Sequence, residues 1–88
     1  MSHPRFTVVP GEGYNNKLTE LWLRDREVVQ EVQDKLDRVL QVIPLQAGIP
    51  FEYEGQSYRF VRYRGYQVVY QIESDDCRVT LLDICTIT

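Results

Sequence analysis

Residues 57–87 read SYRFVRYRGYQVVYQIESDDCRVTLLDICTI, and this stretch decides the fold. It contains three segments rich in β-branched and aromatic residues, which predict strands over 57–63, 66–73 and 78–87. The middle strand alternates with a period of two, so that one of its faces carries Tyr66, Val68, Tyr70 and Ile72. The turns between the strands, at 64–65 and 74–76, are too short for anything but antiparallel pairing.

A long amphipathic helix is predicted from Arg26 to about Val42. Its apolar residues recur at three- and four-residue intervals, namely Val28, Val29, Val32, Leu36, Val39, Leu40 and Ile43. The opposite face is charged, and its acid-before-base pairs at i, i+4 are Glu31–Lys35 and Asp34–Arg38. We expect that face to be solvated, and Pro44 to end the helix, because proline disfavours helical geometry in the residue before it.

The N-terminal part of the chain predicts a short strand and a second helix. The strand covers 5–9 and is followed by a flexible turn at 11–13. The helix runs from Lys17 to about Leu23, with Asn15 or Asn16 as its cap. Leu18, Leu21 and Trp22 share one face of it, and we expect them to pack over the sheet. The segment 45–54 is expected to be a linker.

These elements predict a single domain over 1–88 with an α+β fold of order β-α-α-β-β-β. Two N-terminal helices pack on one face of a small, antiparallel-rich sheet, and the first strand joins that sheet because its backbone must be paired. The other face is then left open. An open face with apolar content on a small protein indicates a partner. Whether the protein also forms a homodimer is left open by the sequence.

The charge of the chain is acidic overall but uneven. The formal net charge is −3 and the sequence pI is about 5.0, whereas proteins that bind nucleic acid backbones usually carry a basic balance. Arg59, Arg62 and Arg64 nevertheless cluster with no acid between Gln56 and Gln71. Two interpretations stand for this cluster: contact with a phosphate-bearing target, or a solvated strand face that keeps a sheet edge from aggregating.

The sequence contains no stretch of the roughly 20 apolar residues that a membrane span requires, and no apolar region follows its N-terminus. We therefore expect a cytoplasmic protein without membrane contact. Cys77 and Cys85 are predicted at opposite ends of one strand, about 26 Å apart, which is too far for a disulfide. The only histidine is His3 and there is no Cys-x-x-Cys pair, so neither a metal nor another cofactor is expected.

Two segments carry a resemblance to a known family. Residues 64–72 (RGYQVVYQI), the acidic turn after them and residues 79–84 (VTLLDI) resemble the core of the RelE/ParE superfamily of bacterial toxins. The helix end at Leu40-x-x-Ile43-Pro44 and the Gly48-x-Pro50 segment are also similar to that family. The resemblance implies a type II toxin–antitoxin system, of the kind linked to plasmid stabilisation, and a paired antitoxin as partner. RelE-like members cleave mRNA on the ribosome, whereas ParE-like members poison DNA gyrase.

Carried over residue by residue, the resemblance leaves most of the nuclease site empty. Gln67 stands where the family has a key arginine, and an amide supplies neither a permanent charge nor a bidentate fork. Arg59 matches a basic position, but the next position on the same side of the strand is Val61. The chain ends Cys85-Thr86-Ile87-Thr88, without the histidine, tyrosine or arginine that the family places after its last strand. These departures argue against an efficient ribonuclease.

Three hypotheses follow. The first is a toxin-like component that acts mainly by protein binding, either ParE-like or as a weakened RelE-like protein. The second is a ribosome-dependent mRNA endoribonuclease with a rearranged site, in which Arg59, Arg62 and Tyr66 are catalytic and Arg59, Arg62 and Arg64 contact the target. The third is a non-toxic interaction module with the same fold. The other tyrosines are expected to serve packing between strands.

Overall fold

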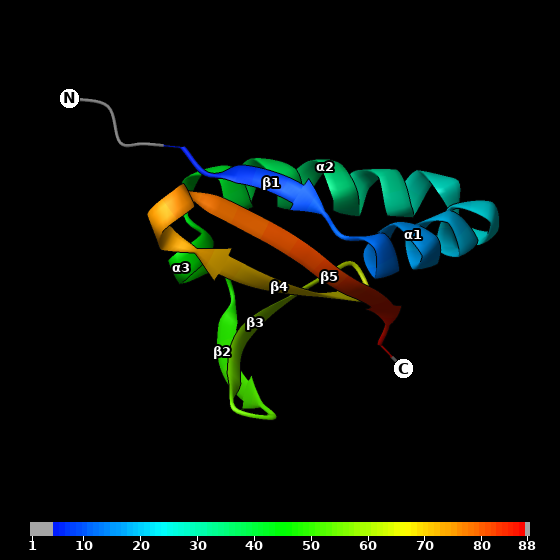
Figure 1. Ribbon diagram of the computed structural model, residues 1–88. Coiled ribbons are helices and arrows are strands. Elements are labelled where there is room, and N and C mark those ends of the chain that lie inside the picture. Colours follow the sequence, from blue (N-terminus) through cyan, green and yellow to red (C-terminus); the bar gives the residue numbers. More distant parts are fainter. Residues whose placement is uncertain (1–4, 88) are drawn as a thin grey trace.

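The computed structural model describes residues 5–87. Its elements follow one another as β1 (Thr7–Pro10), α1 (Glu12–Arg24), α2 (Arg26–Val42), α3 (Pro44–Ala47), β2 (Ile49–Tyr53), β3 (Gln56–Tyr63), β4 (Tyr66–Glu73), the 3₁₀ turn η1 (Ser74–Asp76) and β5 (Arg78–Thr86). Figure 1 shows α1 and α2 together on one side of the sheet, while the β2–β3 hairpin curves away from them. The α+β class and the helices on one face are therefore confirmed.

The five strands form one mixed sheet of order β1-β5-β4-β3-β2. Strands β2 to β5 pair antiparallel, as their short connections require, whereas β1 pairs parallel to β5. The chain reaches this parallel position because α1 and α2 form the crossover between β1 and the rest of the sheet. The backbone N–H of Phe6 also donates to the carbonyl of Gln41 at the end of α2, at 2.8 Å.

The predicted element order was incomplete between 45 and 54. That segment contains the short helix α3 and the edge strand β2, which pairs with β3 from Ile49↔Phe60 to Tyr53↔Gln56. Pro44 does end α2, but it also opens α3 at the first helical turn, where a proline loses no helical hydrogen bond. Pro50 lies in β2, and a proline is tolerated there because β2 is an edge strand.

Helix α1 begins five residues earlier than predicted, at Glu12 rather than Lys17. Gly11 is the N-cap, and its carbonyl accepts from the N–H of Asn15 at 3.0 Å. The N–H of Gly11 donates to the carbonyl of Leu81 in β5, at 2.8 Å. A Cβ at this position would lie 2.8 Å from that carbonyl oxygen, so a glycine allows the close approach. The expected flexible turn is thus a fixed junction between β1 and α1.

A β-bulge in β5 explains how its apolar residues reach one face. Tyr70 pairs with Leu81 and Val69 pairs with Asp83, which leaves Leu82 as the extra residue. The bulge shifts the alternation, so that Leu81 and Ile84 are both buried although they are three residues apart. Residues that the sequence placed across both faces of this strand therefore supply the core.

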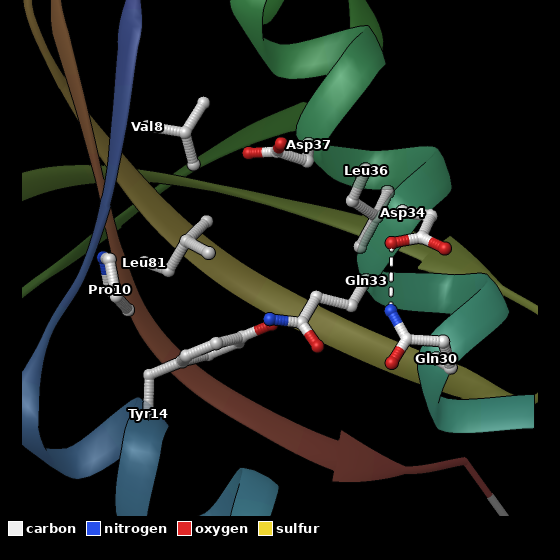
Figure 2. A pocket seen from close by; sticks show the side chains of 9 residues that line it. All are labelled: Val8, Pro10, Tyr14, Gln30, Gln33, Asp34, Leu36, Asp37 and Leu81. Atoms are coloured by element: carbon white, nitrogen blue, oxygen red, sulfur yellow. Dashed lines mark hydrogen bonds between the residues drawn. The ribbon is translucent and has the colours of Figure 1, made fainter. Parts of the chain in front are cut away.

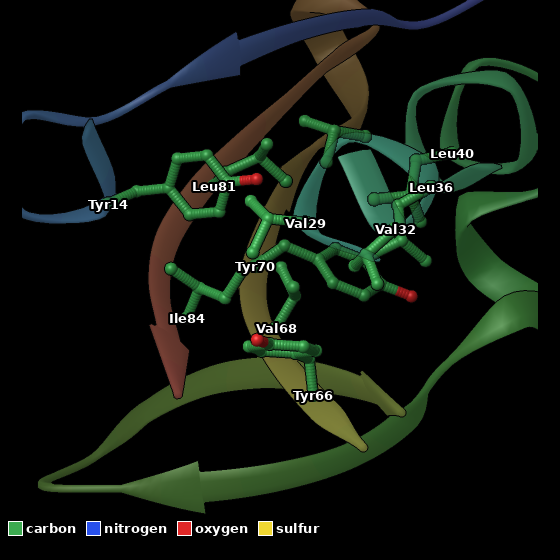
Figure 3. Close-up of a cluster of buried hydrophobic side chains, with 11 residues drawn as sticks. Tyr14, Val29, Val32, Leu36, Leu40, Tyr66, Val68, Tyr70, Leu81 and Ile84 are labelled. Carbon is green, nitrogen blue, oxygen red and sulfur yellow. The ribbon is translucent and has the colours of Figure 1, made fainter. Parts of the chain in front are cut away.

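The core lies between the sheet and the two long helices (Figure 3). Its buried hydrophobic residues are Tyr14, Val29, Val32, Leu36, Leu40, Tyr66, Val68, Tyr70, Val79, Leu81 and Ile84. The predicted apolar face of β4 is confirmed, since Val68 and Tyr70 are fully buried and Ile72 packs against the same cluster. Trp22 also packs against it, as expected.

Two hairpin turns use residues with a positive φ. Glu54 and Gly55 join β2 to β3, and Arg64 and Gly65 join β3 to β4, with φ between 51° and 82°. Two consecutive residues of this kind form the type I′ turn, whose twist matches that of the flanking strands. The second turn fixes the register of β3 against β4, so that Tyr63 lies opposite Tyr66.

Neither cysteine forms a disulfide, as expected: Cys77 precedes β5, Cys85 lies in it, and both thiols are free. Within residues 5–87, no helix combines the length and the apolar character needed to cross a membrane.

Candidate functional site

The sheet has two faces with different chemistry. The inner face packs against α1 and α2 and carries the buried residues of β4, such as Val68 and Tyr70. The outer face carries the alternate residues of each strand. Because directly paired residues point to the same side, the strand register assigns every strand position to a face. The register therefore shows whether the arginines and tyrosines expected to act together share a site.

Arg59 lies on the inner face, opposite Tyr70. Its guanidinium donates to two backbone carbonyls, that of Leu45 at 2.6 Å and that of Gly48 at 2.7 Å. These carbonyls belong to α3 and to the residue after it, which connects α3 to β2. The Nε of Arg59 is buried and has no partner within the described residues. Arg59 thus ties the α3 segment to the sheet, and its donors point toward the protein's own backbone.

Tyr70 secures the same segment from the neighbouring strand. Its hydroxyl donates to the carbonyl of Pro44 at 2.7 Å, in a buried position. Burial raises the pKa of Tyr70, which keeps the hydroxyl protonated as a donor. Gly48 lies directly over this group, since a Cβ there would contact the Tyr70 hydroxyl and lie 2.8 Å from the carbonyl oxygen of Phe60. Arg59 and Tyr70 together hold the turn that leads into β2.

Arg62 lies on the outer face, opposite Gln67 of β4. Its Nε donates to Oε1 of Gln67 at 3.0 Å, and its guanidinium carbon lies 5.3 Å from the centroid of the Phe60 ring. The arginine is exposed. Gln67 is the residue that replaces the arginine expected from the family resemblance, and the structure shows it holding Arg62 beside an aromatic ring.

Arg64 and Tyr66 are placed apart from Arg62. Arg64 occupies the turn after β3, and its Nε lies 2.9 Å from a carboxylate oxygen of Glu31 in α2. Tyr66 belongs to the inner face and is 7% exposed. The proposed catalytic set of Arg59, Arg62 and Tyr66 therefore does not converge, because two members lie on the inner face and one on the outer face. Whether any of them acts on a substrate stays a prediction.

The charged pairs expected along α2 are also different. The salt bridge of Glu31 is with Arg64 rather than with Lys35. The Oδ1 of Asp34 accepts from Gln30 at 2.8 Å, while the Nε of Arg38 reaches only the backbone carbonyl of Asp34. A tertiary contact across the hairpin turn thus replaces one of the two helix-internal pairs.

The outer face of the β2–β3 hairpin forms an aromatic platform, defined here as Ile49, Phe51, Tyr53, Tyr58 and Phe60. The register places all five on the same side. The ring of Phe51 stacks on that of Tyr58, with centroids 5.6 Å apart, and lies 5.8 Å from that of Phe60. Ile49 is 59% exposed and Tyr53 is 63% exposed. A contiguous apolar surface of this kind, rimmed by polar residues, is typical of an interaction site.

Two cations at β5, which β4 separates from the platform, are neutralised by acids. Lys17 of α1 forms a 2.9 Å salt bridge with Asp83 of β5. Arg78, at the far end of β5, pairs with Glu73 and Asp76. Among the described residues of the outer face, Arg62 is therefore the arginine without a carboxylate partner. The surface can bind apolar and aromatic groups, with one guanidinium at its border.

Three of the five platform residues were missed from the sequence because 45–54 was expected to be a linker. A signal was present: Ile49, Phe51 and Tyr53 alternate with Pro50 and Glu52, which is the pattern of a strand with one apolar face. The proline concealed it, although an edge strand accommodates proline.

Comparison with known proteins identifies the fold. No protein-family model matches the sequence, and no curated protein sequence matches it. Among solved structures, a chain of the toxin–antitoxin complex RelBE2 from Mycobacterium tuberculosis is 20% identical, with a TM-score of 0.84; the match covers 97% of this chain and 94% of that chain. The isolated RelE toxin of Escherichia coli is 18% identical, with a TM-score of 0.73 over 94% of this chain and 85% of that chain. The chain therefore has the RelE/ParE toxin fold.

Proposed function

We propose that this protein is the toxin-like component of a type II toxin–antitoxin system and that it acts mainly by binding another protein. The observation that carries the proposal is the extent of the fold match to RelE-type toxins, which covers 97% of this chain in one comparison and 94% in the other. One of the matched structures is that of a toxin–antitoxin complex. An antitoxin is accordingly the first partner, and the cytoplasm is the compartment where both would meet.

The chemistry of the outer face supports binding over catalysis. A phosphodiester-cleaving site needs several cationic or proton-transferring groups around one phosphate. Here the guanidinium of Arg59 is engaged by two backbone carbonyls and that of Arg64 by Glu31 of α2, whereas Arg62 lies on the outer face. The platform instead offers aromatic and aliphatic area, and aromatic residues are enriched at the centres of protein–protein interfaces.

Growth of bacteria during induced expression tests the proposal. We expect growth arrest by the wild-type chain, relief on co-expression of the product of a neighbouring gene, and intact mRNA. Replacing Phe51 and Phe60 together by serine should abolish the arrest while the purified variant keeps its far-UV circular dichroism. Purified DNA gyrase, assayed for inhibition of supercoiling, is the first target to examine. Absence of any growth effect at every expression level would reject a toxin role in favour of the non-toxic interaction module.

The second candidate function is a ribosome-dependent mRNA endoribonuclease. It is favoured by one observation, which is that Arg62 stands beside the Phe60 ring at 5.3 Å, a pairing suited to a phosphate and its adjacent base. Mapping of mRNA 5′ ends after induction separates the two candidates. Cleavage that disappears in Arg62→Ala but persists in Arg64→Ala would establish the nuclease, whereas arrest without cleavage would establish the binding mode.

A further inference from the structure

The two outermost strands of the sheet, β1 and β2, each contain a proline. The strand order β1-β5-β4-β3-β2 leaves one side of each of these strands without a neighbouring strand among the described residues, at opposite edges of the sheet (Figure 1). A free edge presents unpaired N–H and C=O groups, which can pair with a strand of another chain. The hydrogen-bond pattern of each strand decides which backbone groups point outward.

In β2, the backbone groups that point outward belong to Pro50 and Glu52. A hydrogen-bonded pair in an antiparallel ladder needs an N–H from both residues, and such pairs alternate with pairs that are not hydrogen-bonded. Pro50 has no N–H, so its pair with Arg59 is of the second kind, and so is the pair two positions on, Glu52 with Ser57. The carbonyls of Pro50 and Glu52 therefore face the free edge, whereas Glu52 alone supplies an N–H from this strand.

In β1, the same assignment follows from two bonds on the β5 side. The N–H groups of Thr7 and Gly11 each donate to a carbonyl on that side at 2.8 Å. Backbone groups of successive residues point to opposite sides of a parallel strand, so those of Val8 and Pro10 face the free edge. Figure 2 shows both residues on the strand that borders β5. This edge is short, and within β1 only Val8 offers it an N–H.

A proline at an outward position hinders an incoming strand in two ways. It removes one donor from the ladder, and its ring occupies the place where the donated hydrogen would lie. If β2 paired with β2 of a second copy about a two-fold axis at Phe51, the hydrogen bonds would come from the N–H groups of positions 50 and 52 in each copy. Pro50 removes half of these donors and places a ring between the strands in each copy.

The side chains of β2 favour such self-pairing. Ile49, Phe51 and Tyr53 belong to the aromatic platform and alternate along the strand, and Ile49 and Tyr53 are more than half exposed. In the two-fold arrangement, Ile49 of one copy would lie opposite Tyr53 of the other on the outer face, which would join the two platforms. An apolar edge strand of this kind associates with itself unless the edge is blocked.

We propose that Pro50 closes the β2 edge of the sheet against a second copy of this chain, and that restoring an N–H at position 50 turns β2 into a self-pairing edge. The occupant of the opened edge is then β2 of another copy, paired antiparallel with Phe51 opposite Phe51. In the native chain the platform stays free for a different protein. This inference goes beyond the proposed function, because it concerns backbone groups at the sheet edge and does not depend on toxicity.

Sedimentation equilibrium of the purified full chains tests the inference. Pro50→Ala adds an N–H without adding apolar area, and we expect this variant to dimerise with a dissociation constant in the micromolar range. Pro50→Thr adds the same N–H with a side chain favoured in strands, so it should dimerise at least as tightly. The native chain should stay monomeric at the same concentrations. Ser57→Ala is the control, since it places an alanine on the paired strand β3 and leaves the free edge unchanged.

Amide hydrogen exchange locates the contact. In the dimer of Pro50→Ala, the amides of position 50 and of Glu52 should be protected, whereas the Glu52 amide of the native chain should exchange as an unprotected group. A monomeric state of both Pro50→Ala and Pro50→Thr would overturn the inference. Two other results would do the same: a native dimer in which the Glu52 amide is protected, or a dimer of Pro50→Ala in which it is not.

Discussion

Replacing Arg59 by alanine should destabilise the fold, whereas the same change at Arg62 should not. Arg59 donates to the carbonyls of Leu45 and Gly48 at 2.6 and 2.7 Å, and both bonds anchor α3 to β3. Arg62 belongs to the same strand but points to the outer face, where it contacts Gln67 and the Phe60 ring. The two arginines thus form a matched pair in which residue type, strand and charge are held constant.

The magnitude follows from the contacts. A hydrogen bond from a charged donor contributes about 1.5–3 kcal/mol, and half-exposed bonds fall at the low end, so the two bonds of Arg59 contribute about 3 kcal/mol together. The buried Nε without a partner offsets about 1 kcal/mol of this. The net loss on Arg59→Ala is therefore about 2 kcal/mol, or about 10 °C in melting temperature for a domain of this length. Arg62→Ala should cost less than about 0.5 kcal/mol, as most exposed substitutions do.

Urea unfolding provides the assay, because Trp22 is the sole tryptophan and packs against the core. Its fluorescence reports unfolding directly, and far-UV circular dichroism should give the same midpoint if the transition is two-state. The slope of the unfolding free energy against urea concentration should be unchanged in both variants, so that the shift in the unfolding midpoint reports stability alone. Equal stability of Arg59→Ala and Arg62→Ala would refute the anchoring role of Arg59. The Arg59 guanidinium would then be available to contact a target.

Three further predictions concern single side chains. Burial and the nearby Asp37 carboxylate raise the pKa of Tyr14 to about 12 from 10.0, so between these pH values the native state keeps a proton that the unfolded chain loses. The associated stability, about 2–3 kcal/mol, is complete below pH 10 and is lost as the pH rises toward 12. Urea unfolding at about pH 9 and about pH 11.5 should therefore show a smaller loss of stability at the higher pH in Tyr14→Phe than in the wild type. Glu54→Asn should raise the melting temperature by a few degrees, since asparagine tolerates the φ of 51° better than glutamate does, whereas Glu52→Asn in the adjacent strand should not raise it. Gly48→Ala should lower the free energy of unfolding by about 1–3 kcal/mol, because the added Cβ contacts the Tyr70 hydroxyl. Tyr70→Phe in the same chain should recover part of that loss. If the losses of the two single variants simply add in the double variant, the contact is contradicted.

The side on which each arginine lies could have been predicted from the sequence. The two-residue turn at Arg64-Gly65 pairs Tyr63 with Tyr66, and a period of two then places Arg59 opposite Tyr70. Because the alternation of β4 already assigned Tyr70 to the core, Arg59 had to point to the same side. Arg59 and Arg62 were expected in one site. Residues three positions apart in a strand point to opposite faces of the sheet, so that expectation did not fit the strand.

The partners of Arg59 could not have been predicted in the same way. Its acceptors are backbone carbonyls of Leu45 and Gly48, and their position depends on α3, a single helical turn that begins at a proline. Local propensity carries little information about a four-residue helix, because most helical stability comes from tertiary packing. The start of α1 is a similar case, since Gly11 is fixed by its contact with Leu81, a residue 70 positions later in the chain.

Positive charge available to a polyanion is scarce around the sheet, and this limits what the outer face can bind. Five cations at the sheet already have an acceptor: a backbone carbonyl for Arg59, an acid for Lys17, Arg64 and Arg78, and an amide for Arg62. Nucleic acid binding depends on releasing counterions from several phosphates, and a single amide-bonded arginine provides little of that driving force. Binding through the aromatic platform does not depend on free positive charge, because its favourable free energy scales with the apolar area removed from water. This difference supports the proposal that the outer face binds a protein surface rather than a nucleic acid, with Arg62 available to pair with an acidic residue of such a partner.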